Sequence, residues 1–301
     1  MEKLVLFCKS YDKDMLRARR MVESVERFNL DNIPLYISIP PKDLGAFQRC
    51  LKGLPCIILA DSDILSKSVA VFGNLPDLYP HHLIQQLIKL EFWRLGVCRN
   101  YVWIDSDSYF IRPFEVKDFM VDDHTPFTIQ HEYNAEDERR RMHDLPGKVR
   151  NKRIDNTVSM IEKFKGLFGS RSHSDLFGSP PIIWSCAVLE SLYAEYLLPN
   201  KKSIFQLLYE YPCEIQLYGE YIHHCKVIPI HPKAEMFKTY HYLDEFIKSQ
   251  IKGEYEYQLS KKYYGVCIQS NWTTMKAKKG PMDRLKKHLD ECKITLGRLK
   301  F

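Results

Sequence analysis

The sequence lacks the features that mark disulfide-rich, zinc-binding and membrane-spanning proteins. Its nine cysteines are odd in number and scattered, and none forms a C-x-x-C pair. This pattern favours a reducing compartment over a disulfide framework. No apolar run approaches the length of a bilayer span, and the apolar stretch at residues 4–8 is too short for a signal peptide. We therefore expect a cytoplasmic protein.

A glycine-rich phosphate loop is also missing. Residues 9–14, which follow the first apolar stretch, contain no glycine, and this argues against a nucleotidyltransferase with such a loop. No zinc spacing or recognition motif supports nucleic acid as a partner. The formal charge of +6 is concentrated in two basic regions, residues 139–153 and 276–300. These regions could bind phosphates or an anionic lipid surface, or they could be solvated faces.

Composition and patterning indicate a globular α/β protein. The chain of 301 residues is 45% hydrophobic and 27% charged, as in ordinary soluble domains. Apolar strand-like runs at residues 3–8, 34–39 and 56–60 alternate with helical patterns, and a helix at residues 81–98 leads into a further strand that starts at residue 101. Such alternation predicts a right-handed parallel sheet whose carboxyl ends open on one side.

The chain is organised around residues 101–114, where an apolar strand ends in Asp105-Ser106-Asp107. On an extended strand, side chains at i and i+2 point to the same side, so Asp105 and Asp107 could offer oxygen ligands to one magnesium or manganese ion. The plainer alternative is that both residues cap a turn, where Asp is common. Their expected place at the carboxyl end of a strand, where open α/β sheets bind ligands, favours the metal site.

This stretch resembles the metal-binding D-x-D signature of the nucleotide-sugar-dependent glycosyltransferases of GT-A fold. The paired glutamines at residues 85–86 are similar to the donor-side helix of the bacterial members that build surface polysaccharide. The resemblance is specific over residues 1–114 and covers the rest in outline. It implies an α/β, GT-A (Rossmann-like), mostly parallel sheet flanked by helices, with an acceptor-side insertion and a C-terminal helical extension.

The resemblance also implies an activity. We expect a hexosyltransferase that uses Mn²⁺ or Mg²⁺ and moves a sugar from a nucleotide-sugar donor, a UDP-sugar, to a glycan or glycolipid acceptor in lipopolysaccharide or capsule synthesis. The expected partners are the nucleotide-sugar and the acceptor, with peripheral attachment to the inner face of the membrane through the basic C-terminal helix and no nucleic acid.

Another Asp-Ser-Asp triplet, at residues 61–63 and therefore the first of the two along the chain, follows the third strand. Both triplets could face one cleft, because parallel strands share their carboxyl edge. We assign the metal to Asp105 and Asp107, which stand where the resembling family carries its motif and follow the long polar-faced helix.

Donor binding is assigned to residues at the ends of the strands and on that helix. A polar loop between the first strand and a helix is a natural nucleotide site, although the same residues could only cap the helix. Gln85 and Lys89 share a helix face that could hold a diphosphate or a sugar hydroxyl, or could be a solvated face. The predicted donor residues are Lys9, Ser10, Tyr11, Asp12, Asp61, Gln85, Lys89 and Asp105.

Two further roles come from the C-terminal half. Family members often complete the metal site with a histidine, and His241 or His231, the latter at the end of a predicted strand over residues 226–231, would supply it. Glu214, at the head of a predicted helix, matches the placement of a catalytic base that takes the acceptor proton; the alternative is an acid that only favours the helix dipole. An inverting reaction needs this base, and a retaining one does not.

The predicted organisation has four parts. Residues 1–130 form the nucleotide-sugar-binding α/β half, 131–180 a flexible basic insertion with helical pieces at 139–143 and 157–168, 181–275 the acceptor-side half of the same domain, and 276–301 a basic amphipathic helix. Other functions stay open: a metal-dependent phosphohydrolase, although its nucleophile is expected after the first strand, where Cys8-Lys9-Ser10 stands; a nucleotidyltransferase; or a non-catalytic binding protein for glycan or nucleic acid.

Overall fold

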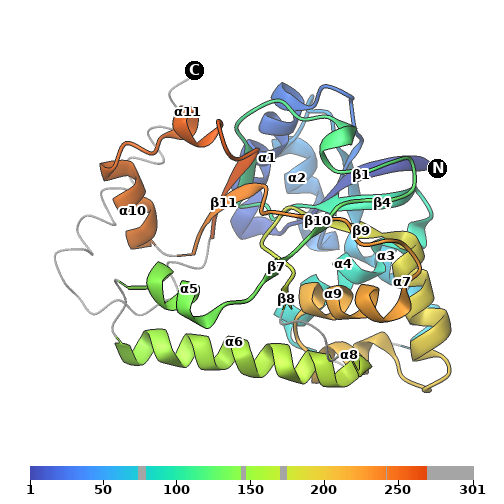
Figure 1. Ribbon diagram of the computed structural model, residues 1–301. Helices are drawn as coiled ribbons and strands as arrows, with labels where there is room; N and C mark the ends of the chain where they lie inside the picture. Colours follow the sequence, from blue (N-terminus) through green and yellow to red (C-terminus); the bar gives the residue numbers. More distant parts are fainter. Residues whose placement is uncertain (74–78, 144–146, 170–174, 242, 270–301) are drawn as a thin grey trace.

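The computed structural model describes residues 1–73, 79–143, 147–169, 175–241 and 243–269. A five-stranded sheet is built from β1 (Glu2–Lys9), β2 (Leu35–Ile39), β3 (Ile57–Ala60), β4 (Cys98–Trp103) and β9 (Ile182–Ser185). The strand order is β3-β2-β1-β4-β9 (Figure 1). All neighbouring pairs are parallel except β4 and β9. The predicted α/β class with a mostly parallel sheet is thus confirmed.

Helices cover both faces of this sheet, as its buried strands require. Residues 4–8 of β1 are all buried, and a strand buried on both faces needs a layer on each side. Figure 1 shows α1 and α2 on one side of the sheet and α4, α7 and α9 on the other. The helices here are α1 (Met15–Phe28), α2 (Leu44–Cys50), α3 (Asp61–Phe72), α4 (His81–Glu91), α7 (Cys186–Ser191), α8 (Ile204–Glu210) and α9 (Glu214–Cys225). Single tighter or wider turns lie at Asp12–Asp14, Pro41–Asp43, Phe92–Leu95, Val116–Asp118 and Leu192–Leu197.

The helix predicted over residues 81–98 ends earlier. The α-helix stops at Glu91 and is followed by a 3₁₀ turn. Gly96 then takes a left-handed conformation with φ of 67°, which glycine adopts without strain and which commonly ends helices. β4 can therefore begin at Cys98.

Three smaller sheets complete the fold. The first has the order β11-β12-β5, and the others pair β6 with β10 and β7 with β8. Their bounds are β5 (Ser108–Phe110), β6 (Thr128–Ile129), β7 (His131–Glu132), β8 (Asp175–Leu176), β10 (Pro232–Lys233), β11 (Phe237–Tyr240) and β12 (Gly265–Ile268). The strand predicted at residues 226–231 is wrong: Lys226 ends α9 with a positive φ of 52°, and Pro229 cannot donate to a ladder. The pairing starts only at Pro232.

The segment predicted as an insertion contains regular structure. It holds α5 (Ala135–Arg141) and the long α6 (Gly147–Phe168), with β7 and β8 pairing at its two ends. α6 begins ten residues before the helical piece predicted at residues 157–168. The prediction started too late because the first two turns of α6 are basic and hide the helical spacing of its apolar residues, among them Ile154 and Ile161. The predicted helix at 276–301 lies outside the described residues.

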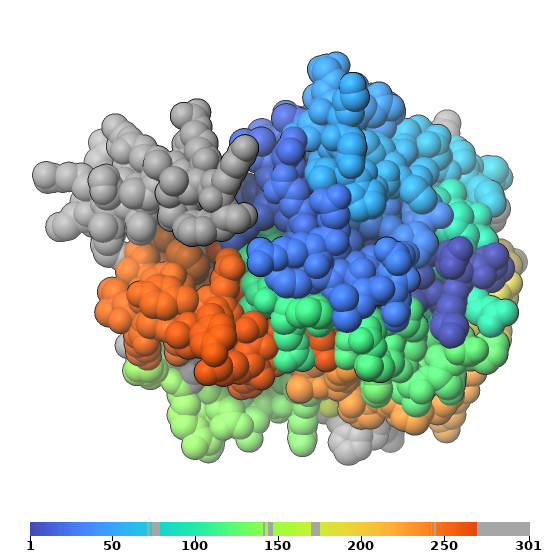
Figure 2. All heavy atoms as spheres, turned by 90° about the horizontal axis from the view of Figure 1, so that it is seen from above, coloured from blue at the N-terminus to red at the C-terminus, as the bar shows by residue number. Residues whose placement is uncertain are grey.

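Elements from the C-terminal part lie beside α1. α11 (Glu256–Leu259) contacts α1, whereas α10 (Leu243–Ile251) packs against β11. Arg20 of α1 reaches the Glu256 carboxylate at 3.2 Å, and Figure 2 shows the orange C-terminal elements alongside blue N-terminal ones. Within the described ranges, eight cysteines are free thiols, and no helix there combines the length and apolar character of a membrane span.

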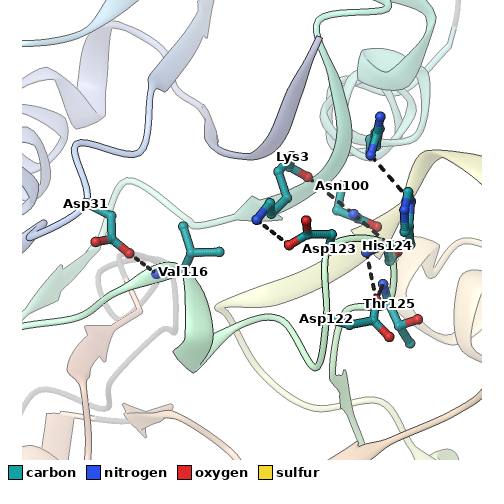
Figure 3. Close-up of polar contacts among 9 residues, drawn as sticks. Lys3, Asp31, Asn100, Val116, Asp122, Asp123, His124 and Thr125 are labelled. Carbon is teal, nitrogen blue, oxygen red and sulfur yellow. Dashed lines mark hydrogen bonds and ion pairs between the residues drawn. The ribbon is translucent and has the colours of Figure 1, made fainter.

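The loop at residues 121–125 is fastened to the amino edge of the sheet (Figure 3). Asp123 pairs with Lys3 at the start of β1. Asp122 accepts the backbone N–H groups of His124 and Thr125 at 2.7 and 2.8 Å, and these bonds lower the pKa of its carboxyl. This loop thus lies at the amino edge of the sheet. The D-x-D residues lie at the opposite, carboxyl edge, where β1 and β4 end.

We expect Glu91 to make folding pH-dependent. Its side chain is 0% exposed, and burial raises its pKa from 4.5 to about 8 against the opposing effect of Arg94. The pKa of Glu91 is higher in the folded protein than in the unfolded chain, so the neutral Glu91 carboxyl contributes its full stability below pH 4.5. The free energy of unfolding should then fall as the pH rises to about 8, by up to about 1.4 kcal/mol per pH unit. Urea unfolding at several pH values should show a flatter profile for Glu91→Gln. Parallel profiles for the two proteins would contradict this.

Two glycines should respond in opposite ways to alanine. A Cβ on Gly219 of α9 would lie 2.0 Å from the Phe177 ring, whereas one on Gly166 of α6 meets nothing within 4 Å. Gly219→Ala should lower the free energy of unfolding by about 2 kcal/mol through overpacking. Gly166→Ala should raise it by roughly 0.5–1 kcal/mol, since glycine is a poor helix former. Equal effects in urea titration would show that α9 and Phe177 are not in this contact.

Candidate active site

The site lies between β1 and β4, where the order in which the chain connects the strands reverses across the sheet. β1 continues through α1 to β2 on one side, while β3 returns through α3 and α4 to β4 on the other side of β1. The carboxyl ends of β1 and β4 are therefore neighbours, and open α/β sheets bind ligands at such a point. Lys9 ends β1, and Asp105 follows β4 by two residues.

The D-x-D residues form a turn and not an extended strand. β4 stops at Trp103, β5 starts at Ser108, and the Ser108 N–H donates to the Asp105 carbonyl at 3.0 Å. The prediction that Asp105 and Asp107 share one face of an extended strand is therefore wrong. The two carboxylates contact different partners: Asp105 contacts Lys89, and Asp107 accepts from the Cys267 thiol at 3.5 Å.

Lys89 contacts two of the other predicted residues, Asp105 and Glu214. Its ammonium lies 2.9 Å from Asp105 Oδ1 and 3.3 Å from Glu214 Oε1. The side chains of Lys89 and Glu214 are 9% and 8% exposed, while that of Asp105 is 38% exposed. Burial works to lower the pKa of Lys89, but the carboxylates of Asp105 and Glu214 outweigh it and raise that pKa above its ordinary value. Lys89 is therefore a permanent cation at this edge.

The position of Lys89 is fixed at both ends. The Tyr101 hydroxyl donates to the Lys89 carbonyl at 2.7 Å, and the ammonium lies 3.7 Å from the centroid of the Trp103 ring. A cation over an indole face is attracted to it. Glu214 is the first residue of α9, where the helix dipole favours a carboxylate; burial raises the pKa of this carboxyl, and Lys89 opposes that shift.

A second buried ion pair stands beside the first. Lys9 lies 3.0 Å from Asp61 Oδ2, and the Ser38 hydroxyl donates to Asp61 Oδ1 at 2.5 Å. Burial lowers the pKa of Lys9 and raises that of Asp61, and in each case the partner charge opposes the shift. Burial raises the pKa of the Cys8 thiol. The charges of Asp105, Lys89, Lys9 and Asp107 also act on this thiol, which therefore lies close to both ion pairs.

The first Asp-Ser-Asp triplet is engaged in other contacts. Asp61 is held by Lys9 and Ser38, as described, and Asp63 accepts the Ala60 N–H at 3.0 Å at the start of α3. Of the two triplets, only the second presents a carboxylate, that of Asp105, that is both over a third exposed and beside a buried cation.

The two candidate histidines lie on different sheets. His231 directly precedes β10, which pairs with β6. His241 follows β11, whose neighbour β12 pairs with β5 next to the D-x-D turn. The Ile268 N–H of β12 donates to the Asp107 carbonyl at 3.0 Å. The small sheet therefore connects His241, and not His231, to Asp107.

The other predicted donor residues lie around this edge. Ser10 is buried directly after β1, and Tyr11 is partly exposed. Asp12 is exposed, and its N–H donates to Asp43 at 3.2 Å. Gln85 is exposed on α4, whereas its neighbour Gln86 donates to the Pro212 carbonyl at 3.5 Å. Gln85 thus does not share the buried contact of Lys89.

The donor atoms suit a hard cation bound in part by substrate. In the described residues no group of three or more His, Cys, Asp or Glu side chains could hold a metal by itself. Magnesium is commonly held by one or two carboxylates together with substrate phosphates and water, and Asp105 and Asp107 offer such a pair. The ionic groups gathered here are four carboxylates and two ammonium groups: Asp61, Asp105, Asp107, Glu214, Lys9 and Lys89. Asp43 also acts on Lys9 and Asp61, so the carboxylates outnumber the ammonium groups at this edge.

Sequence reasoning missed four contributors. Ser38, Trp103, Cys8 and Cys267 all lie in strands and read as core positions. Only Ser38 carried a signal, since it is a hydroxyl within an otherwise apolar strand whose neighbours end in charged residues.

We expect the Lys9 pair to be essential for folding stability. Asp61→Asn would leave the Lys9 ammonium, 5% exposed, without its countercharge, which costs about 3 kcal/mol for buried pairs. Asp12→Asn, an identical change at an exposed position, should shift the free energy of unfolding by less than about 0.5 kcal/mol. Urea titration compares the two, and a loss below about 1 kcal/mol for Asp61→Asn would show that the pair is not buried in solution.

Comparison with known proteins gives a family and distant structural likenesses. No curated protein matches the chain. Among solved structures, the crystal structure of mouse xyloside xylosyltransferase 1 in its apo form is similar with a TM-score of 0.45 and 10% identity, over 89% of this chain and 98% of that chain. The fold class rests on the strand order given above. Residues 4–250 match a family described as being of unknown function, DUF6492. Because the match covers most of the chain, the protein belongs to this family.

Proposed function

We propose that this protein is a nucleotide-sugar-dependent glycosyltransferase of GT-A type that uses Mn²⁺ or Mg²⁺ and transfers a sugar to a glycan or glycolipid acceptor. The observation that carries the proposal is the Lys89 ammonium, held at 2.9 Å from Asp105 at the point between β1 and β4 where α/β sheets bind ligands. The D-x-D turn that follows β4 supports the resemblance on which the donor class rests.

The charges at the site explain why a metal is part of the proposal. A nucleoside diphosphate is an anion, and the excess of carboxylates here would repel it. Asp107, with Asp105, would hold the cation. When bound, a divalent cation supplies positive charge against the diphosphate that leaves the anomeric carbon. His241 stands as a further proposed ligand, on the sheet that carries Asp107.

The chain's own residues would bind and orient the donor. Lys89 adds a fixed positive charge beside the diphosphate. Tyr11 and Asp12 line the exit from β1, where we place the nucleoside, and the buried Lys9 and Ser10 support this exit from below. The Lys9–Asp61 pair is too buried to meet solvent freely, so we assign it to shaping the floor of this part of the site.

The test is nucleoside diphosphate release from a panel of nucleotide sugars with and without Mn²⁺. Asp107→Asn should lower metal-dependent release by about 100-fold, the size of effect seen when one electrostatic group is removed from an active site. Asp63→Asn makes the same change in the other triplet, where the amide oxygen can still accept from Ala60, and should keep release unchanged.

Two results would overturn the proposal. One is no release from any nucleotide sugar by the intact protein. The other is release of inorganic phosphate from phosphomonoesters in place of nucleotide release, which would make the protein a phosphohydrolase.

A further inference from the structure

Glu214 is the acid at the head of a helix that sequence reasoning selects as a base, yet its carboxylate is not directed at open solvent. Its side chain is 8% exposed, and Oε1 lies 3.3 Å from the Lys89 ammonium. A general base must come within hydrogen-bond reach of the proton that it removes. Of the two carboxylates on Lys89, Asp105 is the one on the open side, with 38% of its side chain exposed.

We propose that Glu214 is a positioning residue that holds the Lys89 ammonium against Asp105, and so fixes the D-x-D turn from behind. The consequence for donor binding rests on the proposed function, whereas the placement of Lys89 does not. Glu214 then acts on the reaction only through Lys89.

Electrostatics favours this role. A buried ammonium with one partner would follow that partner whenever the turn moved, whereas a second carboxylate at the start of α9 gives it a fixed attachment. α9 is itself attached to β8, because Gln216 donates to the Asp175 carbonyl at 3.0 Å. Lys89 is thus held by a helix that does not belong to the turn.

The other acid on α9 does not take over the role of base. Glu220 is 3% exposed and is bonded to Gln216. It contacts neither Lys89 nor the D-x-D turn in the described structure, so it provides a matched control on the same helix.

The fluorescence emission of Trp103 allows the placement of Lys89 to be tested without enzymatic turnover. The Lys89 ammonium lies 3.7 Å from its ring centroid, and a nearby cation alters indole emission. Emission of each variant is compared with that of the same variant carrying Trp103→Phe, and the difference reports the emission that depends on Trp103 and on its contact with Trp184, whose ring centroid lies 5.5 Å away.

The experiment compares Glu214→Gln, Glu214→Asp and Glu220→Gln, with circular dichroism as the check on folding. Glu214→Gln should change the Trp103 emission, weaken binding of uridine diphosphate with Mn²⁺ by about tenfold, as loss of an outer partner of a metal site does, and raise KM for the donor more than it lowers kcat. Glu214→Asp, which keeps the charge, should restore most of the binding. Glu220→Gln should leave emission and binding unchanged.

The proposal fails if Glu214→Gln leaves Trp103 emission and diphosphate binding unchanged while kcat falls by 100-fold or more, since that is the behaviour of a base. If Glu214→Gln does not fold, Asp105→Asn on the exposed side of Lys89 provides the emission test: Glu214 still holds the ammonium over Trp103, so the emission should stay unchanged, and a changed emission overturns the proposal. If the intact protein binds no diphosphate, the proposed function fails, and the emission comparison still decides whether Glu214 positions Lys89.

Discussion

One ammonium group, that of Lys89, brings together parts of the chain that are far apart in sequence. It belongs to α4, and its partners are Asp105 in the turn after β4 and Glu214 at the start of α9. A buried charge is tolerated only when partners surround it. α4, the turn after β4 and the start of α9 must therefore lie together for the Lys89 charge to be neutralised, and they meet at the carboxyl edge of the sheet.

The charge balance at this edge is the second constraint. Lys9 and Asp61 neutralise each other within the floor, whereas Lys89 faces more carboxylate than it can neutralise. A site with surplus carboxylate is suited to a divalent cation and, through it, to an anionic diphosphate. The same surplus explains why Lys89 stays charged even though it is buried.

Much of the fold could be predicted from the sequence because it depends on local pattern. The apolar runs that became β1 to β4 are short, bounded and separated by helical periods, and this alternation predicts parallel pairing with right-handed connections. The same reasoning placed Lys89 near Asp105, since α4 leads directly into β4. Local pattern failed at residues 226–231, where a proline interrupts the run, and in α6, whose basic first turns hide its apolar period.

The detailed geometry of the site could not be predicted in this way. Whether Asp105 and Asp107 lie on a strand or in a turn depends on β12, which pairs with β5 from more than 150 residues away. The contact between Lys89 and Glu214 spans 125 residues, and Trp103 below the ammonium reads in sequence as an ordinary core residue. These contacts are non-local, so neither period nor spacing reveals them.

The pairing of β12 has a consequence for where the functional unit ends. The family match stops at residue 250, but Ile268 holds the backbone of Asp107 and Cys267 holds its carboxylate. A protein trimmed at the family boundary would keep the whole central sheet and lose the strand that supports the acidic turn. The segment matched by the family and the complete candidate site are therefore not the same length of polypeptide.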